Sequence, residues 1–242
     1  MKINLKRIVC NGLFVVLVLG FCFATGGYLR GYSFRELMNM MQAVVAARCD
    51  RKTIEDRLVE IERNHPDLDR LAQNLEDGLS ILVFKKERRV ELWAKGLDTP
   101  RVYQMTGFSG GLGPKLKEGD GQIPEGIYGV EYLNPNSLFY LSLKVSYPND
   151  FDLEMAKKDG RTELGGDIMI HGGTATVGCM PIGDENIEEI FYLVAKAGLR
   201  NVKVVIAPYD MRKGRNHDLE KIGLPWYSRL CDAVEKELGR KF

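Results

Sequence analysis

The sequence predicts an α+β fold in which a β-rich domain containing one late helix is flanked by helices at both ends. Three patterns lead to this prediction. Between residues 33 and 77, apolar residues recur at helical spacing behind capping residues. From residue 81 onward, short apolar runs alternate with turn residues, as is typical of strands. One amphipathic segment, 184–198, interrupts these strands late, and a last helix is expected from Pro225.

The N-terminal helices are predicted from their starts. Ser33 and Glu36 have the spacing of a capping box, and an apolar stripe rich in methionine follows them. Thr53 and Asp56 repeat that spacing, and Asp67 can begin a third short helix. The methionine-rich stripe is interpreted as a packing face, with a partner-binding surface as the alternative.

The strands are predicted at 81–84, 90–94, 102–107, 127–132, 139–147, 167–171 and 202–207. A charged hairpin, 85–89, joins the first two, and the Gly-, Lys- and Pro-rich segment 107–126 is expected to be loop. Asp184 is expected to cap the late helix and Gly198 to end it. The last helix should turn Leu230, Val234 and Leu238 inward.

The first 30 residues have the composition of a secretory signal or a membrane anchor. An apolar run, 8–24 and extendable to 29, follows Lys2, Lys6 and Arg7. We therefore expect export to the periplasm or cell envelope, with anchoring in the inner membrane if the segment is retained. The predicted divisions are 1–30 (signal or anchor), 31–77 (helical region), 78–211 (β-rich domain) and 212–242 (C-terminal helical extension).

Composition narrows the possible functions. With a net charge of +1, the chain as a whole has no excess of positive charge that would attract nucleic acid, so nucleic acid is not expected as a partner. The five cysteines show no metal-ligand spacing, so neither a metal nor an organic cofactor is expected. Cys49 and Cys231 either pair or remain half-buried thiols.

The stretch from Ile170 to Cys179 carries the candidate chemistry. An apolar strand delivers His171 at its end, and a short glycine-rich loop then leads to Gly178-Cys179. A cysteine nucleophile needs a base, a group that orients the base, and backbone N–H donors for the oxyanion. We assign Cys179 as nucleophile and His171 as base, a carbonyl near Gly172 or Gly173 as orienting group, and the N–H groups of Gly178 and Cys179 as oxyanion donors.

Two motifs resemble those of the YkuD-type L,D-transpeptidases. The first is His171-Gly172, a spacer, and Thr176-Val177-Gly178-Cys179; the second is Gly119-Asp120 followed by Pro124-Glu125-Gly126-Ile127-Tyr128. The resemblance covers residues 78–209 and is closest to the YafK-like branch, which shares Ser146-Tyr147-Pro148-Asn149. It implies a β-rich catalytic domain, a mixed β-sandwich with an inserted helix. Val177 stands where many members have His, and Met180-Pro181 replaces the usual apolar residue followed by Arg or Asn.

The resemblance also implies a reaction. Cys179 would attack the third, L-configured residue of a peptidoglycan stem peptide and form a thioester, which an amine or water then resolves. The partners implied are stem peptides, with a wall-attached protein as a further one. Gly172 joins the backbone groups around the oxyanion, and the expected substrate contacts are Thr176, Tyr128, Tyr147 and Lys115.

Alternatives remain open at this point. The YafK-like branch includes hydrolases that release proteins from peptidoglycan, so hydrolysis is the first alternative. A non-catalytic, membrane-tethered peptidoglycan-binding module is the second, and a scaffold built on helices 33–77 is the third. Asp120 is expected to support a turn and Glu125 to pair with a neighbour. His65 and His217 are expected to be solvated.

Overall fold

The computed structural model describes residues 51–73, 75, 78–94 and 97–240. The predictions for residues 1–50, including the apolar run, the first capping box and Cys49, lie outside this part. Within it, no helix has the length and apolar character needed to cross a membrane.

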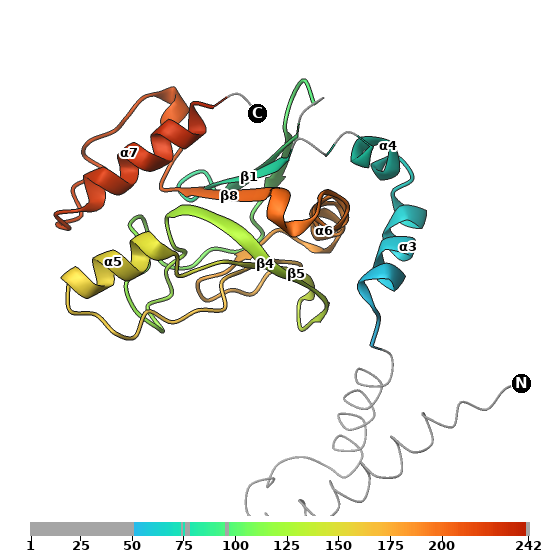
Figure 1. Ribbon diagram of the computed structural model, residues 1–242, viewed down its shortest axis with the longest axis horizontal. Coiled ribbons are helices and arrows are strands. Elements are labelled where there is room, and N and C mark those ends of the chain that lie inside the picture. The colour runs from blue at the N-terminus through green and yellow to red at the C-terminus, as the bar shows by residue number, and fades with distance from the viewer. Residues whose placement is uncertain (1–50, 74, 76–77, 95–96, 241–242) are drawn as a thin grey trace, which may run out of the picture. The chain divides into compact units, whose positions relative to one another are not determined.

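Eight strands form one curled sheet in the order β3-β2-β1-β8-β4-β5-β6-β7 (Figure 1). The strands are β1 (Leu79–Phe84), β2 (Arg89–Ala94), β3 (Arg101–Gln104), β4 (Gly126–Ser137), β5 (Tyr140–Val145), β6 (Met169–His171), β7 (Met180–Pro181) and β8 (Val202–Ala207). The pairs β1–β8 and β6–β7 are parallel and the others antiparallel. The mixed α+β class is confirmed.

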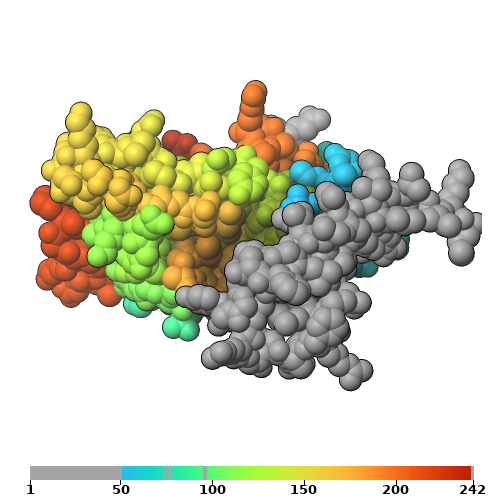
Figure 2. All heavy atoms as spheres, turned by 90° about the horizontal axis from the view of Figure 1, so that it is seen from below, coloured from blue at the N-terminus to red at the C-terminus, as the bar shows by residue number. Residues whose placement is uncertain are grey.

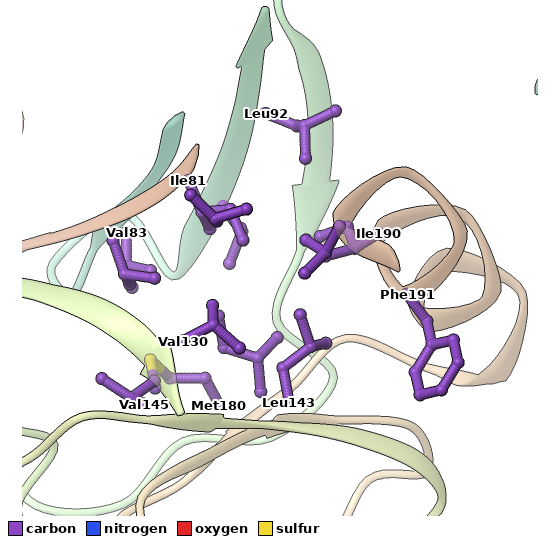
Figure 3. Packing of buried hydrophobic residues seen from close by; sticks show 14 of the residues in the cluster. Ile81, Val83, Leu92, Val130, Leu143, Val145, Met180, Ile190 and Phe191 are labelled. Atoms are coloured by element: carbon purple, nitrogen blue, oxygen red, sulfur yellow. The ribbon is translucent and has the colours of Figure 1, made fainter. Parts of the chain in front are cut away.

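Strand β4 joins the two halves of the sheet. Its first residues, Gly126 to Gly129, pair with β8, and the rest pair with β5 across two register shifts. Such irregularities bend a strand and increase its twist. The two halves consequently face each other across a shared core, in which Ile81 and Val83 lie opposite Val130 and Val145 (Figure 3).

The helices cover the sheet and close the core. They are α3 (Ile54–Asn64), α4 (Leu68–Ala72), α5 (Asp150–Lys158), α6 (Asp184–Ala197) and α7 (Tyr227–Leu238), with short 3-10 turns at Leu199–Asn201 and Met211–Lys213. Ile190 of α6 points into the core between the sheet halves (Figure 3). On the other face of β1 and β8, α7 buries Leu230, Val234 and Leu238, as predicted.

Several local predictions are confirmed and others are wrong. Thr53 and Asp56 form the predicted capping box of α3, and Gly198 ends α6. Asp67 stands at the start of α4 without a side-chain cap, and Gly183 rather than Asp184 is the N-cap of α6. Helix α5 and the two-residue strand β7 were not predicted from the sequence. Cys231 is a buried free thiol in the cluster under α7.

Candidate active site

His171 ends β6 and is almost fully buried, with 1% of its surface exposed. Its Nδ1 lies 2.6 Å from the carbonyl oxygen of Gly172. A carbonyl oxygen only accepts hydrogen bonds, so Nδ1 carries the hydrogen and the neutral ring has its lone pair on Nε2. The predicted orienting carbonyl is thus present, and it leaves Nε2 as the proton acceptor.

The environment keeps this imidazole neutral. Burial lowers the pKa of His171, and the hydrogen bond to Gly172 offsets part of that effect. Phe139, in the turn between β4 and β5, stacks on the ring with centroids 4.6 Å apart and planes inclined by 28°. One face of the imidazole is therefore shielded from water by an aromatic side chain.

Cys179 immediately precedes β7, the strand that pairs with the end of β6 carrying His171. Ile170 pairs with Met180 and His171 with Pro181. Continuing this register by one residue would set Cys179 opposite Met169, which shares a face of the sheet with His171 because side chains alternate along a strand. The β6–β7 pairing thus brings the segments that carry the two predicted catalytic residues next to each other.

The thiol is protonated in this state. Burial raises the pKa of Cys179, and a hydrogen bond from the Met169 main chain offsets part of the rise. The Sγ–H donates to the carbonyl oxygen of Asp167 at 3.4 Å. Among the described residues, the polar contacts of the thiol are with this main chain rather than with His171. Attack by the sulfur therefore requires the thiol to turn toward Nε2.

Both predicted oxyanion donors are already engaged by side-chain hydroxyls. The N–H of Gly178 donates to Ser109 Oγ at 2.6 Å, and the N–H of Cys179 donates to Thr176 Oγ1 at 2.9 Å. The Thr176 hydroxyl in turn donates to the Cys179 carbonyl at 2.7 Å. Thr176, predicted as a substrate contact, here braces the loop that carries the nucleophile.

Glycines permit the close packing of this loop. Gly178 has φ +90°, and a Cβ there would lie 3.1 Å from the carbonyl oxygen of Gln122. A Cβ on Gly172 would lie 2.5 Å from Asp184 Oδ1. The N–H of Gly172 donates to the Leu141 carbonyl at 3.1 Å, so Gly172 orients His171 rather than binding an oxyanion.

Asp184 has a different role from the predicted helix cap. Its Oδ1 accepts the Gly173 N–H at 2.7 Å, while the Gly173 carbonyl accepts the Thr106 hydroxyl at 2.7 Å. The carboxylate thereby ties the start of the cysteine loop (residues 172–179) to the first turn of α6.

The glycine-rich loop (residues 107–125) packs directly against the cysteine loop. Figure 2 shows its green surface next to the gold surface of the segment that leads to β7. The contact includes Ser109 with Gly178, and a Cβ on Gly107 would meet the Thr174 carbonyl at 2.1 Å. The segment was predicted to be loop, but nothing in the sequence around Ser109 singled out that residue.

The other predicted substrate contacts are interior. Lys115 Nζ donates to Asp120 Oδ1 at 2.7 Å and to the Lys117 carbonyl at 2.8 Å. Tyr128 and Tyr147 are 5% and 4% exposed, and their rings meet edge-to-face at 6.2 Å. The two tyrosine hydroxyls donate to main-chain carbonyls of the glycine-rich loop and so support it. Lys115 does lie within reach of the thiol, because its charge offsets part of the rise in the pKa of Cys179.

The predictions for the remaining polar residues are partly confirmed and partly wrong. Asp120 accepts three backbone N–H groups of its turn, and Glu125 pairs with Lys85 at 2.9 Å, both as expected. His65 is not a solvated loop residue, because its Nε2 lies 2.8 Å from Glu188 Oε2. His217 is exposed, as predicted.

Within the described ranges, no group of three His, Cys, Asp or Glu side chains is placed to hold a metal ion.

His171 thus lies at the end of β6 and Cys179 immediately before β7, the two strands at one edge of a curled mixed sheet. The model of the YkuD family, described as the L,D-transpeptidase catalytic domain, matches residues 79–206, and the chain belongs to that family. The putative L,D-transpeptidase YafK of Escherichia coli strain K12 is 34% identical over 139 residues, as is that of strain O157:H7. The match covers 54% of this chain and 54% of each relative, so the chain spans about half the length of the curated relatives it matches.

Solved structures with a similar arrangement include the helical cell shape determining protein Pgp2 of Campylobacter jejuni. Its K307A mutant is 23% identical, with a TM-score of 0.40 over 65% of this chain and 55% of that chain. L,D-transpeptidase 1 of Mycobacterium tuberculosis is 13% identical, with a TM-score of 0.30 over 54% and 62%.

Proposed function

We propose that this chain is a cysteine-dependent acyl transferase that acts on peptidoglycan stem peptides through a thioester. The observation that carries the proposal is a neutral His171, with its lone pair on Nε2, at the end of the strand that pairs with the segment carrying Cys179. The family supports the substrate class, because its catalytic domain is that of L,D-transpeptidases.

In the proposed reaction, Cys179 makes the nucleophilic attack and His171 transfers the protons. Nε2 of His171 takes the thiol proton as the Cys179 sulfur attacks the carbonyl carbon of the third, L-configured stem residue. The resulting oxyanion collapses, the C–N bond breaks, and the imidazolium returns the proton to the departing amine. An acceptor amine or water then attacks the thioester while His171 takes its proton. The C–S bond breaks and the imidazolium returns the proton to the Cys179 sulfur, which gives transpeptidation with the amine and hydrolysis with water.

The oxyanion needs donors that Ser109 and Thr176 occupy in the resting state. The energy of an oxyanion hole comes from N–H groups aimed at the developing charge. A charged acceptor is a stronger partner for an N–H than a hydroxyl. We therefore propose that the oxyanion displaces at least the Ser109 hydroxyl from the Gly178 N–H.

Two alternatives retain specific support. Met180 and Pro181 form the buried strand β7, so no polar side chain follows the nucleophile to hold an amine acceptor, and this favours hydrolysis. The engagement of both N–H donors favours a binding module that performs no chemistry.

One experiment distinguishes the transpeptidase, the hydrolase and the binding module. The full chain is incubated with peptidoglycan sacculi that carry attached protein, and the digested wall is analysed by mass spectrometry. Cys179→Ala is compared with Cys231→Ala, which removes a buried thiol of α7. New cross-links or exchange of the terminal D-residue, lost only in Cys179→Ala, would establish a transpeptidase. Release of attached protein or shortened stems would establish the hydrolase. No change dependent on Cys179 would overturn the catalytic proposal in favour of binding.

We also propose that the domain works outside the cytoplasmic membrane. The apolar run that follows Lys2, Lys6 and Arg7 supports this placement. A C-terminal epitope on the full chain should be digested by protease added to intact spheroplasts. Protection until the spheroplasts are lysed would contradict export.

A further inference from the structure

Helix α3 lies outside the matched family domain, yet it contacts the turn beside the catalytic histidine. Arg57 of α3 donates from Nε to the carbonyl oxygen of Pro135 in β4 at 2.9 Å. Its guanidinium carbon also lies 5.0 Å from the ring centroid of Tyr140, the first residue of β5. The side chain is 13% exposed, so these contacts are largely shielded from water.

Glu188 of α6 holds Tyr140 from another direction. Glu188 is 7% exposed, accepts the Tyr140 hydroxyl at Oε1, and lies with Oε2 2.8 Å from His65 Nε2. Burial and the neighbouring Glu188 raise the pKa of Tyr140 to about 12, so the hydroxyl stays protonated and donates. His65 follows the last residue of α3. The helix thus reaches Tyr140 both directly and through Glu188.

The Tyr140 backbone needs such support. Its φ is +71°, in the left-handed region that non-glycine residues rarely adopt. Backbone strain of this kind persists only where the surroundings hold it in place. The preceding residue is Phe139, whose ring stacks on His171 and whose carbonyl is packed against Gly172. A change in the Tyr140 backbone would therefore move the ring that covers His171.

We infer that Arg57 and Glu188 are positioning residues that fix the end of the β4–β5 hairpin (residues 134–140), so that Phe139 holds the His171 imidazole in place. The inference rests on the proposed function only in that His171 is the base there. It assigns helix α3, which precedes the family domain, a part in the geometry of the catalytic site.

The inference has a direct physical readout. Burial causes the lowered pKa of His171, and Phe139 supplies part of that burial. The ionisable side chains on the elements packed against this strand include Asp184 and Glu188 on α6, Lys144 on β5 and Cys179 before β7. None of these charges causes the shift. Loosening the turn should admit water to the ring and raise its pKa.

The experiment measures the His171 pKa by NMR in the full chain kept in mild detergent. The chain has three histidines, so labelled imidazoles can be assigned by comparison with His171→Ala. In Arg57→Ala we expect the His171 pKa to rise by about half a unit or more. Arg63→Ala is the matched control, because Arg63 is an exposed residue of the same helix and should leave the titration unchanged.

Phe139→Leu and Glu188→Gln guard against a variant that fails to fold. Phe139→Leu removes the stacked ring directly and should raise the His171 pKa in the same direction, while Glu188→Gln should do so through Tyr140. A folded Arg57→Ala and a folded Glu188→Gln with unchanged His171 titration would overturn the inference, even if Phe139→Leu shifts it. A shift in a chain inactive on sacculi would leave the inference standing and remove the proposed function.

Discussion

The proposed nucleophile and the proposed base both rest uncharged, since burial raises the pKa of the Cys179 thiol and lowers that of the His171 imidazole. A thiolate–imidazolium pair would need the opposite shifts. The proton must therefore move when the substrate is in place. This arrangement protects the thiol from alkylation and oxidation between turnovers, because the thiolate is the reactive form.

The first prediction concerns the pH dependence of activity. His171 must be neutral to accept the proton, and its pKa lies below the ordinary value of 6.5. The kcat/KM on stem peptides should fall as pH decreases, with the midpoint of the acidic limb below 6.5. His171→Ala should abolish activity, whereas His217→Ala, at an exposed position, should preserve it. An acidic limb centred above 6.5 would contradict the assignment.

The second prediction concerns Ser109. Its hydroxyl competes for the Gly178 N–H, and a neutral hydrogen bond contributes about 1 kcal/mol. Ser109→Ala should therefore raise kcat by about threefold to tenfold while slightly lowering the melting temperature. Steady-state kinetics beside Ser228→Ala, an exposed position on α7, test this. A lower kcat in Ser109→Ala would mean that the hydroxyl assists the reaction.

Among the elements, the glycine-rich loop depends on a buried ion pair beneath it. Lys85 has no exposed side-chain surface, and its Nζ contacts the carbonyls of Gly113 and Ile123 at 2.6 and 2.8 Å as well as Glu125. Glu125 also accepts the Tyr227 hydroxyl of α7 at 2.5 Å. The prediction of a charged hairpin at 85–89 did not indicate that Lys85 is buried. Through this cluster, helix α7 of the C-terminal extension contacts the glycine-rich loop, which packs against the cysteine loop.

The third prediction ranks two substitutions in that cluster. Lys85→Met leaves Glu125 buried without its cation, which should cost about 3 to 5 kcal/mol in the free energy of unfolding. Tyr227→Phe removes one hydrogen bond and should cost about 1 to 2 kcal/mol. Chemical denaturation should give this order, with Tyr132→Phe, at a site 40% exposed, close to wild type. A larger loss in Tyr227→Phe would contradict the ranking.

Elements differ in how much the sequence alone could predict. Strand β8 was predicted with its observed bounds, because a run of β-branched residues lies between clear turn signals. Helix α5 was missed because its nine residues are mostly charged and only Asp152, Met155 and Ala156 are buried. Strand β7 is two residues long and exists only through pairing with β6.

The residues of the candidate site show the same contrast between those that a local sequence pattern reveals and those that only the fold reveals. His171 and Cys179 stand in one short motif, so their roles could be inferred from a single stretch of chain. Ser109 and Phe139 contact this motif from segments distant in sequence, and Glu188 acts on it only through Tyr140. Their contacts depend on strand register and helix placement, which local patterns do not specify.

For the whole molecule, Asp152 links folding stability to pH. Burial raises its pKa to about 6, against an ordinary value of 3.8. The folded state therefore holds this proton more tightly than the unfolded chain does. The resulting stabilisation is complete below about pH 4 and is lost as the pH rises through 6.

The fourth prediction follows from this sign. Between pH 4 and pH 7, the free energy of unfolding of the wild type should fall by about 2 to 3 kcal/mol relative to that of Asp152→Asn. Asparagine keeps an oxygen that can accept the Asn149 N–H. Urea denaturation of both proteins at the two pH values measures the difference. Parallel pH profiles would contradict it.

The pairing of β1 with β8 determines when the domain can fold. Leu79 pairs with Val202 and Phe84 with Ala207, so the centre of the sheet joins segments from opposite ends of the domain. Pairings so distant in sequence form slowly and late. While the chain is being synthesised, β1 lacks one of its two neighbouring strands until β8 emerges, and that edge of β1 stays open to other chains. Any chaperone that serves this protein would have to shield β1 during that interval.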